Sequence, residues 1–255
     1  MTNDRVLLQL WSGQRERILK ELAFYHEQSK KKLLGAFANM EKDADEYTEQ
    51  EYERMGQYFN PEWHDPGDFA ESAYEKGIDF YGLLEDLRDH TILGISAGMY
   101  HEWEKQLRDW LHRELLHLFQ QEKLQQQIWK VNIADIFEFL NGCGWDIKNQ
   151  PFYTTLDSCR LVVNVYKHGM GGSFNDLKAQ HPQFLKKYAL DTDTGPSAWT
   201  DFADHTHLVV TADDIDKFYQ GFVNFWKFVP ENTLLSQVTD VPKWFEKAVA
   251  ERRSA

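Results

Sequence analysis

The chain has 255 residues, of which 42% are apolar and 15% aromatic, and this composition excludes an intrinsically disordered protein. Its formal net charge of −13 argues against extensive non-specific binding of nucleic acid, because phosphate is neutralised by Lys and Arg. Two cysteines provide no disulfide framework, and no stretch approaches 18 consecutive apolar residues. The first residues lack the basic flank and apolar run of a signal peptide. We therefore expect a cytoplasmic protein that does not cross a membrane.

Hydrophobic periodicity predicts helices along most of the chain. Apolar residues recur at three- and four-residue spacing from residue 6 onwards through the first fifty residues, and residues 40–58 continue as an acidic, solvated helix. Two prolines and a glycine in residues 60–68 must break this helix. Further helices are expected at residues 69–87, 95–130, 132–140, 152–168, 211–229 and 242–253. One strand is expected, at residues 207–211.

These elements predict an all-α fold with one or two short strands at most. We expect an N-terminal helical extension over residues 1–60 and a helical bundle over residues 68–230. The remaining residues, 231–255, are expected to form a C-terminal helix that packs on the bundle.

The most informative segment is the helix expected at residues 152–168, which stops at Gly169. At 100° per residue, its polar side chains share one arc, and they are Arg160, Asn164, Lys167 and His168. Apolar or aromatic side chains cover the rest of the circumference: Leu161, Val162, Val163, Val165 and Tyr166. The helix is therefore expected to be buried almost all round. Burying polar groups is costly unless they are paired or used, so this stripe needs an explanation.

Two interpretations of the stripe remain open. In the first, it is a buried polar network that ties helices together, with Arg160 paired to a carboxylate. In the second, it is catalytic: His168 acts as general acid or base, Arg160 or Lys167 stabilises anionic charge, and Asn164 orients a reacting group. The charge distribution favours an anionic ligand here, since residues 148–187 carry a net charge of +4 against −17 for the remainder.

Metal and cofactor motifs are weak. Glu114 and His117 have the Glu-x-x-His spacing of carboxylate-bridged di-metal bundles, but the sequence has no second pair of this kind. The glycine-rich turn after His168 lacks the Gly-Lys-Ser ending of a phosphate-binding loop. We therefore expect no metal and no cofactor.

Arg160, Asn164 and His168, in the pattern Arg…Asn-x-x-Lys-His-Gly after long antiparallel helices, resemble the HEPN superfamily, whose members are helical bundles. Many of these proteins carry an Arg-x(4–6)-His motif on the last main helix, and Arg160 and His168 would occupy its two positions. Seven residues separate them here, so Lys167 is the candidate for the closer cation. A second motif, aromatic-Glu-x-x-Leu, matches Trp103 to Leu107, with Glu104 as a supporting acidic residue that faces the Arg or His.

The resemblance covers mainly residues 95–226 and implies a function. It implies a metal-independent endoribonuclease that acts on RNA, with tRNA as a candidate substrate, and that combines two motifs at a homodimer interface. It also implies a toxin or an anti-phage defence effector with an antitoxin or defence-system partner protein. The alternative is a non-catalytic helical module that binds a nucleotide or a protein and regulates it.

Overall fold

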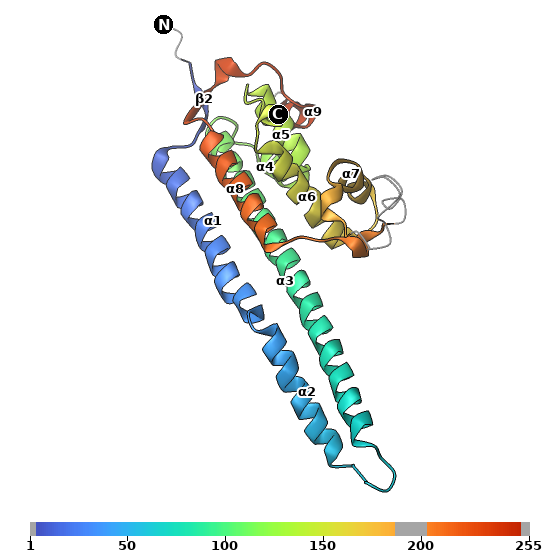
Figure 1. Ribbon diagram of the computed structural model, residues 1–255. Helices are drawn as coiled ribbons and strands as arrows, with labels where there is room; N and C mark the ends of the chain where they lie inside the picture. Colours follow the sequence, from blue (N-terminus) through green and yellow to red (C-terminus); the bar gives the residue numbers. More distant parts are fainter. Residues whose placement is uncertain (1–3, 187–202, 251–255) are drawn as a thin grey trace.

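The fold is all-α, and the computed structural model describes residues 4–186 and 203–250 (Figure 1). Its α-helices are α1 (Ser12–Lys32), α2 (Met40–Gly56), α3 (Pro66–Leu116), α4 (Glu122–Lys130), α5 (Ile133–Gly142), α6 (Tyr153–His168), α7 (Gly172–Gln180), α8 (Ala212–Phe228) and α9 (Lys243–Ala250). Two short strands, β1 (Val6–Gln9) and β2 (Asn232–Leu234), pair antiparallel. Within the described ranges, every helix is too short or too polar to traverse a lipid bilayer.

A long helical hairpin dominates the shape of the molecule. Helices α1 and α2 follow each other and run antiparallel to α3, so that α2 and the first half of α3 extend away from the other helices (Figure 1). We call residues 40–90 the α2–α3 hairpin. Its tip contains the predicted helix break, where the Asp65 side chain accepts a hydrogen bond of 2.7 Å from the Gly67 backbone and caps α3.

The core lies at the other end of α3, where α8 contacts α1, α3 and α6. Large aromatic side chains fill it: the Trp103 ring stacks on Phe222 at 5.2 Å and meets Phe225 edge-on at the same centroid distance. Burial of such rings contributes a large share of core stability. The core also contains five apolar side chains of the N-terminal segment: Leu7, Leu8, Leu10, Ile18 and Leu22. Helix α1 is therefore packed against the bundle that it was expected to extend.

Three expectations about local structure are wrong. Residues 6–9, expected to be helical, form β1, and the Trp110 indole donates to the Gln9 carbonyl at 2.9 Å. Residues 205–207 form a 3-10 turn, and the strand expected at residues 207–211 is reduced to one bridge between Leu185 and Leu208. The helices expected at residues 69–87 and 95–130 are joined, because α3 is continuous through residues 88–94 and ends at Leu116.

Candidate functional site

Helix α6 holds the polar stripe and is fixed by its apolar face. Leu161, Val162, Val163 and Val165 are at most 1% exposed and pack into the core, as expected. The helix ends at Gly169, whose φ of 68° is a conformation that favours glycine and whose N–H donates to the Val165 carbonyl. Lys167 and His168 therefore occupy the last turn, where positive charge is favoured by the helix dipole.

The expectation that α6 is buried almost all round fails at its C-terminal end. Tyr166 is 41% exposed, and Lys167 and His168 are exposed as well, whereas Asn164 is half-buried. The stripe is therefore divided. Its first member, Arg160, is partly buried with a side chain 28% exposed, and its last two members are exposed.

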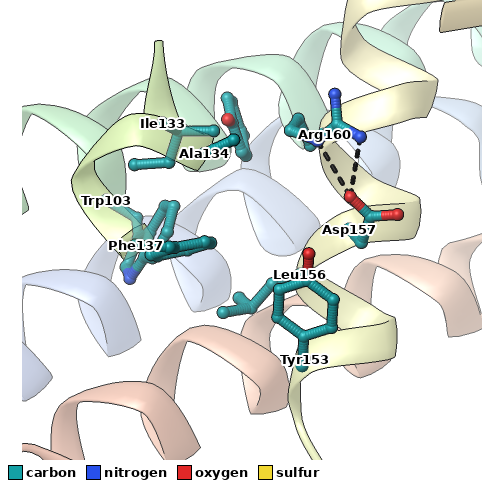
Figure 2. Close-up of a pocket in the computed structure, with 9 residues that line it drawn as sticks. Trp103, Ile133, Ala134, Phe137, Tyr153, Leu156, Asp157 and Arg160 are labelled. Atoms are coloured by element: carbon teal, nitrogen blue, oxygen red, sulfur yellow. Dashed lines mark hydrogen bonds and ion pairs between the residues drawn. The ribbon is translucent and has the colours of Figure 1, made fainter. Parts of the chain in front are cut away.

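Arg160, the first member of the stripe, is engaged within its own helix. Its Nε and Nη2 donate to Oδ1 of Asp157 at 2.9 and 2.7 Å (Figure 2). Both side chains are largely buried, and Oδ2 of Asp157 lies 3.8 Å from Nε2 of the buried His181. This pairing matches the structural interpretation of Arg160 as part of an internal polar network.

A small cavity adjoins this ion pair between α3, α5 and α6 (Figure 2). Its lining is mainly aromatic and aliphatic, and it comprises Tyr100, Trp103, Ile133, Ala134, Phe137, Tyr153, Leu156, Asp157 and Arg160. Burial raises the pKa of Tyr100 and of Tyr153, so both hydroxyls stay protonated at neutral pH. The cavity volume is about 100 Å³, far below the roughly 300 Å³ at which ligand pockets begin. It is too small for a nucleotide.

Glu104 is also engaged within its own helix. Its Oε1 accepts hydrogen bonds from Arg108 Nη2 at 2.5 Å and from Arg108 Nε at 3.0 Å. Arg108 is buried, and its remaining Nη1 donates to the Ile128 carbonyl of α4. Glu104 was expected to face Arg160 or His168, but the bonds it makes neutralise a buried guanidinium on α3. A buried cation needs such a partner.

Helix α3 brings a further histidine, His101, towards the exposed end of α6. Burial lowers the pKa of His101, Glu104 raises it, and the positive charge of Lys167 lowers it further. The imidazole of His101 is therefore mostly neutral at neutral pH and close enough to Lys167 to sense its charge. Sequence spacing did not single out His101, because His101 and Lys167 lie on two different helices and are 66 residues apart in the sequence.

A fourth basic side chain, His205, lies beside the end of α6. A Cβ built on Gly169 would lie 3.6 Å from the Cδ2 atom of the His205 ring. We call His101, Lys167, His168 and His205 the α6-end cluster. Lys167 and His168 are neighbours in the last turn of α6, and ammonium and imidazole groups are the side chains that acid–base chemistry beside an anion uses.

Across the residues that the structure places, no three His, Cys, Asp or Glu side chains gather as a metal site would require. Comparisons of the chain with protein-family models, with curated proteins and with solved structures found no match.

Proposed function

We propose that the chain is a metal-independent endoribonuclease that cleaves RNA, with tRNA as a candidate substrate, and that works as a homodimer. The observation that carries the proposal is the exposure of Lys167 and His168 side by side in the last turn of α6. The charge of Lys167 also lowers the pKa of His101 on α3. We infer the homodimer from the HEPN resemblance. In it, the exposed end of α6 would contact the same end of α6 in the second copy.

The charge distribution in space supports this assignment. The α2–α3 hairpin carries 16 Asp and Glu against 4 Lys and Arg, a net charge of −12. The rest of the chain therefore has a net charge of only −1. Since the hairpin points away from α6, most of the acidic charge is remote from the α6-end cluster (Figure 1). The electrostatic objection to an RNA substrate is thus weak at this site.

The cluster contains the groups that RNA cleavage requires. As the 2′-oxygen attacks phosphorus, the neutral His101 imidazole would accept the proton of the 2′-hydroxyl, and a protonated His168 would donate a proton to the departing 5′-oxygen. Lys167 would stabilise the negative charge that develops on the non-bridging oxygens. The P–O5′ bond breaks, and the products are a 2′,3′-cyclic phosphate and a 5′-hydroxyl.

Arg160 and Glu104 have supporting parts in this proposal. Arg160 lies eight residues before His168, so their Cα atoms are about 12 Å apart along the helix. Its ion pair with Asp157 holds the middle of α6, and the Glu104–Arg108 pair holds the facing part of α3. Asn164, half-buried on α6 one turn after Arg160, would orient the phosphate.

The proposed setting follows from the same resemblance. We place the protein in the cytoplasm as a toxin or an anti-phage defence effector, controlled by an antitoxin or another defence-system protein. Both thiols, Cys143 and Cys159, are free and buried, which fits a reducing compartment.

Cleavage assays would test the proposal directly. The full-length protein is incubated with total RNA and with tRNA in EDTA, and 2′,3′-cyclic phosphate ends are captured by ligation. We expect cleavage that His168→Ala and Lys167→Ala reduce by at least about a hundredfold, the usual contribution of acid–base groups. His90→Ala, an exposed histidine of α3 outside the cluster, is the matched control and should cleave normally. Equal cleavage by His168→Ala would exclude the proposal.

A second function, the non-catalytic module, is favoured by the engagement of Arg160 and Glu104 in internal ion pairs. It predicts that the wild-type protein leaves RNA intact. Thermal melting separates the two: because His168 is exposed, His168→Ala should not change the melting temperature. A substantial decrease would mean that His168 has a structural role.

A further inference from the structure

The α2–α3 hairpin contains an open groove that is unrelated to the α6-end cluster. It has a volume of about 480 Å³ and lies between the two helices of the hairpin. Its lining residues are Glu41, Ala44, Asp45, Thr48 and Glu49 from α2 and Tyr74, Gly77, Ile78 and Tyr81 from α3.

Small residues bring the two helices close together along the floor of the groove. Ala44 and Gly77 are buried, and a Cβ on Gly77 would lie 1.9 Å from Oγ1 of Thr48. Such a close approach leaves no room for a larger side chain between the helices. The floor is therefore formed by the backbones and small side chains of both helices.

The α3 wall of the groove is apolar and exposed. Tyr74 is 63% exposed and Ile78 is 54% exposed, although both are large apolar side chains. With Tyr81, they follow each other at four- and three-residue spacing, so they lie along one face of α3. A contiguous exposed apolar face of this kind marks an interaction surface.

The α2 wall is a row of carboxylates. Glu41, Asp45 and Glu49 recur every four residues and are all exposed. The basic side chains of the hairpin are paired elsewhere: Lys42 with Glu46, Arg54 and Lys76 with Glu51, and Arg88 with Asp89. Within the described ranges, no Lys or Arg lies within ion-pair distance of the three carboxylates. They remain available to an external cation.

We propose that this groove binds a cationic amphipathic helix of a partner protein. Its apolar face would pack on Tyr74 and Ile78, and Lys or Arg side chains at one-turn intervals would pair with Asp45 and Glu49. The row from Glu41 to Glu49 is about 12 Å long, which two to three turns of the occupant would match. The net charge of −12 on the hairpin disfavours the two other candidates, a second copy of this chain and nucleic acid, through like-charge repulsion.

Binding of a synthetic peptide to the full-length protein tests the proposal. The probe is a fluorescent amphipathic helix of about 14 residues, with Leu on one face and Lys on the other, measured by fluorescence anisotropy. A scrambled peptide of the same composition keeps the charge but has no apolar face. We expect the amphipathic peptide to bind at least about tenfold more tightly than the scrambled one. Equal affinity would reduce the interaction to general charge attraction and overturn the proposal.

Matched variants locate the site. Asp45→Asn with Glu49→Gln should weaken binding by roughly tenfold, as expected for the loss of two exposed ion pairs. Asp43→Asn with Glu53→Gln removes the same charge from exposed positions of α2 outside the groove and should have a clearly smaller effect. Ile78→Ser should weaken binding, whereas Leu83→Ser, at another exposed apolar position of α3, should not. If the groove variants and their matched controls weakened peptide binding equally, in either comparison, the groove would not be the binding site.

Two further readouts keep the result interpretable. Because Ile78 is more than half exposed, circular-dichroism melting of Ile78→Ser should match that of wild type, so that weaker binding reports the groove. Sedimentation velocity tests the second copy as occupant. If the wild type self-associates and Ile78→Ser abolishes this association, the groove is a homodimer surface and the proposed cationic partner is wrong.

Discussion

Arg160 donates two hydrogen bonds to one carboxylate oxygen of Asp157, which lies one helical turn earlier on α6. Arg160, the cation of the predicted Arg…His motif, is thus already paired within its own helix. Asp157 also lies 3.8 Å from the buried His181, so this carboxylate joins α6 to the end of α7. The relationship divides the stripe of α6 into a structural half and an exposed half.

Removing Asp157 should therefore destabilise the protein. Asp157→Ala leaves the largely buried Arg160 without its partner, and we expect a loss of about 1–3 kcal/mol in the free energy of unfolding, measured by urea denaturation. A double-mutant cycle with Arg160→Ala should give a favourable coupling energy between the two residues. A coupling energy near zero would show that the ion pair contributes nothing to stability.

The titration of His101 is a second test. Burial and the charge of Lys167 lower its pKa below 6.5, so His101 should be neutral at pH 7 and become protonated only at lower pH. Since the folded-state pKa is lowered, the associated stability is present above pH 6.5 and is lost as the pH falls through the folded pKa. NMR titration of the imidazole would measure this pKa, and Lys167→Gln should raise it. If the pKa were unchanged in that variant, Lys167 and His101 would not interact.

Acid should weaken the α2–α3 hairpin in a defined pH range. Hydrogen bonds from Arg54 and Lys76 lower the pKa of Glu51 to about 2 from an ordinary value of 4.5. The corresponding stability is therefore present above pH 4.5 and is lost as the pH falls towards 2. Melting curves between these pH values should show a smaller pH dependence for Glu51→Gln than for Glu53→Gln, an exposed control on the same helix. Identical slopes would show that Glu51 is not responsible.

Close packing of the hairpin depends on Gly77. Alanine favours helix over glycine by about 1 kcal/mol, so Gly82→Ala, where nothing lies within 4 Å of the new Cβ, should stabilise α3. Gly77→Ala should instead destabilise the protein by about 1–3 kcal/mol, because its Cβ would collide with Thr48. Thr48→Ala should relieve much of that loss. Similar melting temperatures for the two glycine variants would contradict the close approach.

Both thiols should be unreactive in the native protein. Burial raises the pKa of Cys143 to about 12 and that of Cys159 well above its ordinary value. The thiolate is the reactive form, so a disulfide reagent at pH 8 should modify neither residue until the protein is unfolded. Rapid modification of one thiol under native conditions would reveal local opening around that residue.

Local signals predicted much of the fold. Helix α6 ends at Gly169 as expected, α5 (Ile133–Gly142) lies where a helix was expected at residues 132–140, and residues 60–68 break the helices. The errors occur where tertiary contacts decide. Pairing with β2 makes residues 6–9 a strand, although their apolar spacing fits a helix. Burial of Ile92, Leu93 and Ile95 keeps α3 continuous.

The candidate site could be predicted only in part. The position of the stripe on α6 follows from helical periodicity, and the three-residue spacing of Asp157 and Arg160 was available in the sequence as an ion-pair signal. The role of His101 was not, because its proximity to Lys167 depends on how α3 packs against α6. The four-residue spacing of Glu104 and Arg108 was also visible as an ion-pair signal, whereas the burial of Arg108 was not.

The 51 residues of α3 form one uninterrupted helix, about 76 Å long. From Ile78 to His101 this helix rises about 35 Å, so a short peptide seated in the hairpin groove cannot reach the end of α6. A partner held there would leave the α6 end uncovered and would act as a tether at a nearly fixed spacing. Whatever the partner is attached to would then supply the target at high effective concentration. In that arrangement, binding at the hairpin would localise the protein, and His101, further along the same helix, would take part in the proposed cleavage.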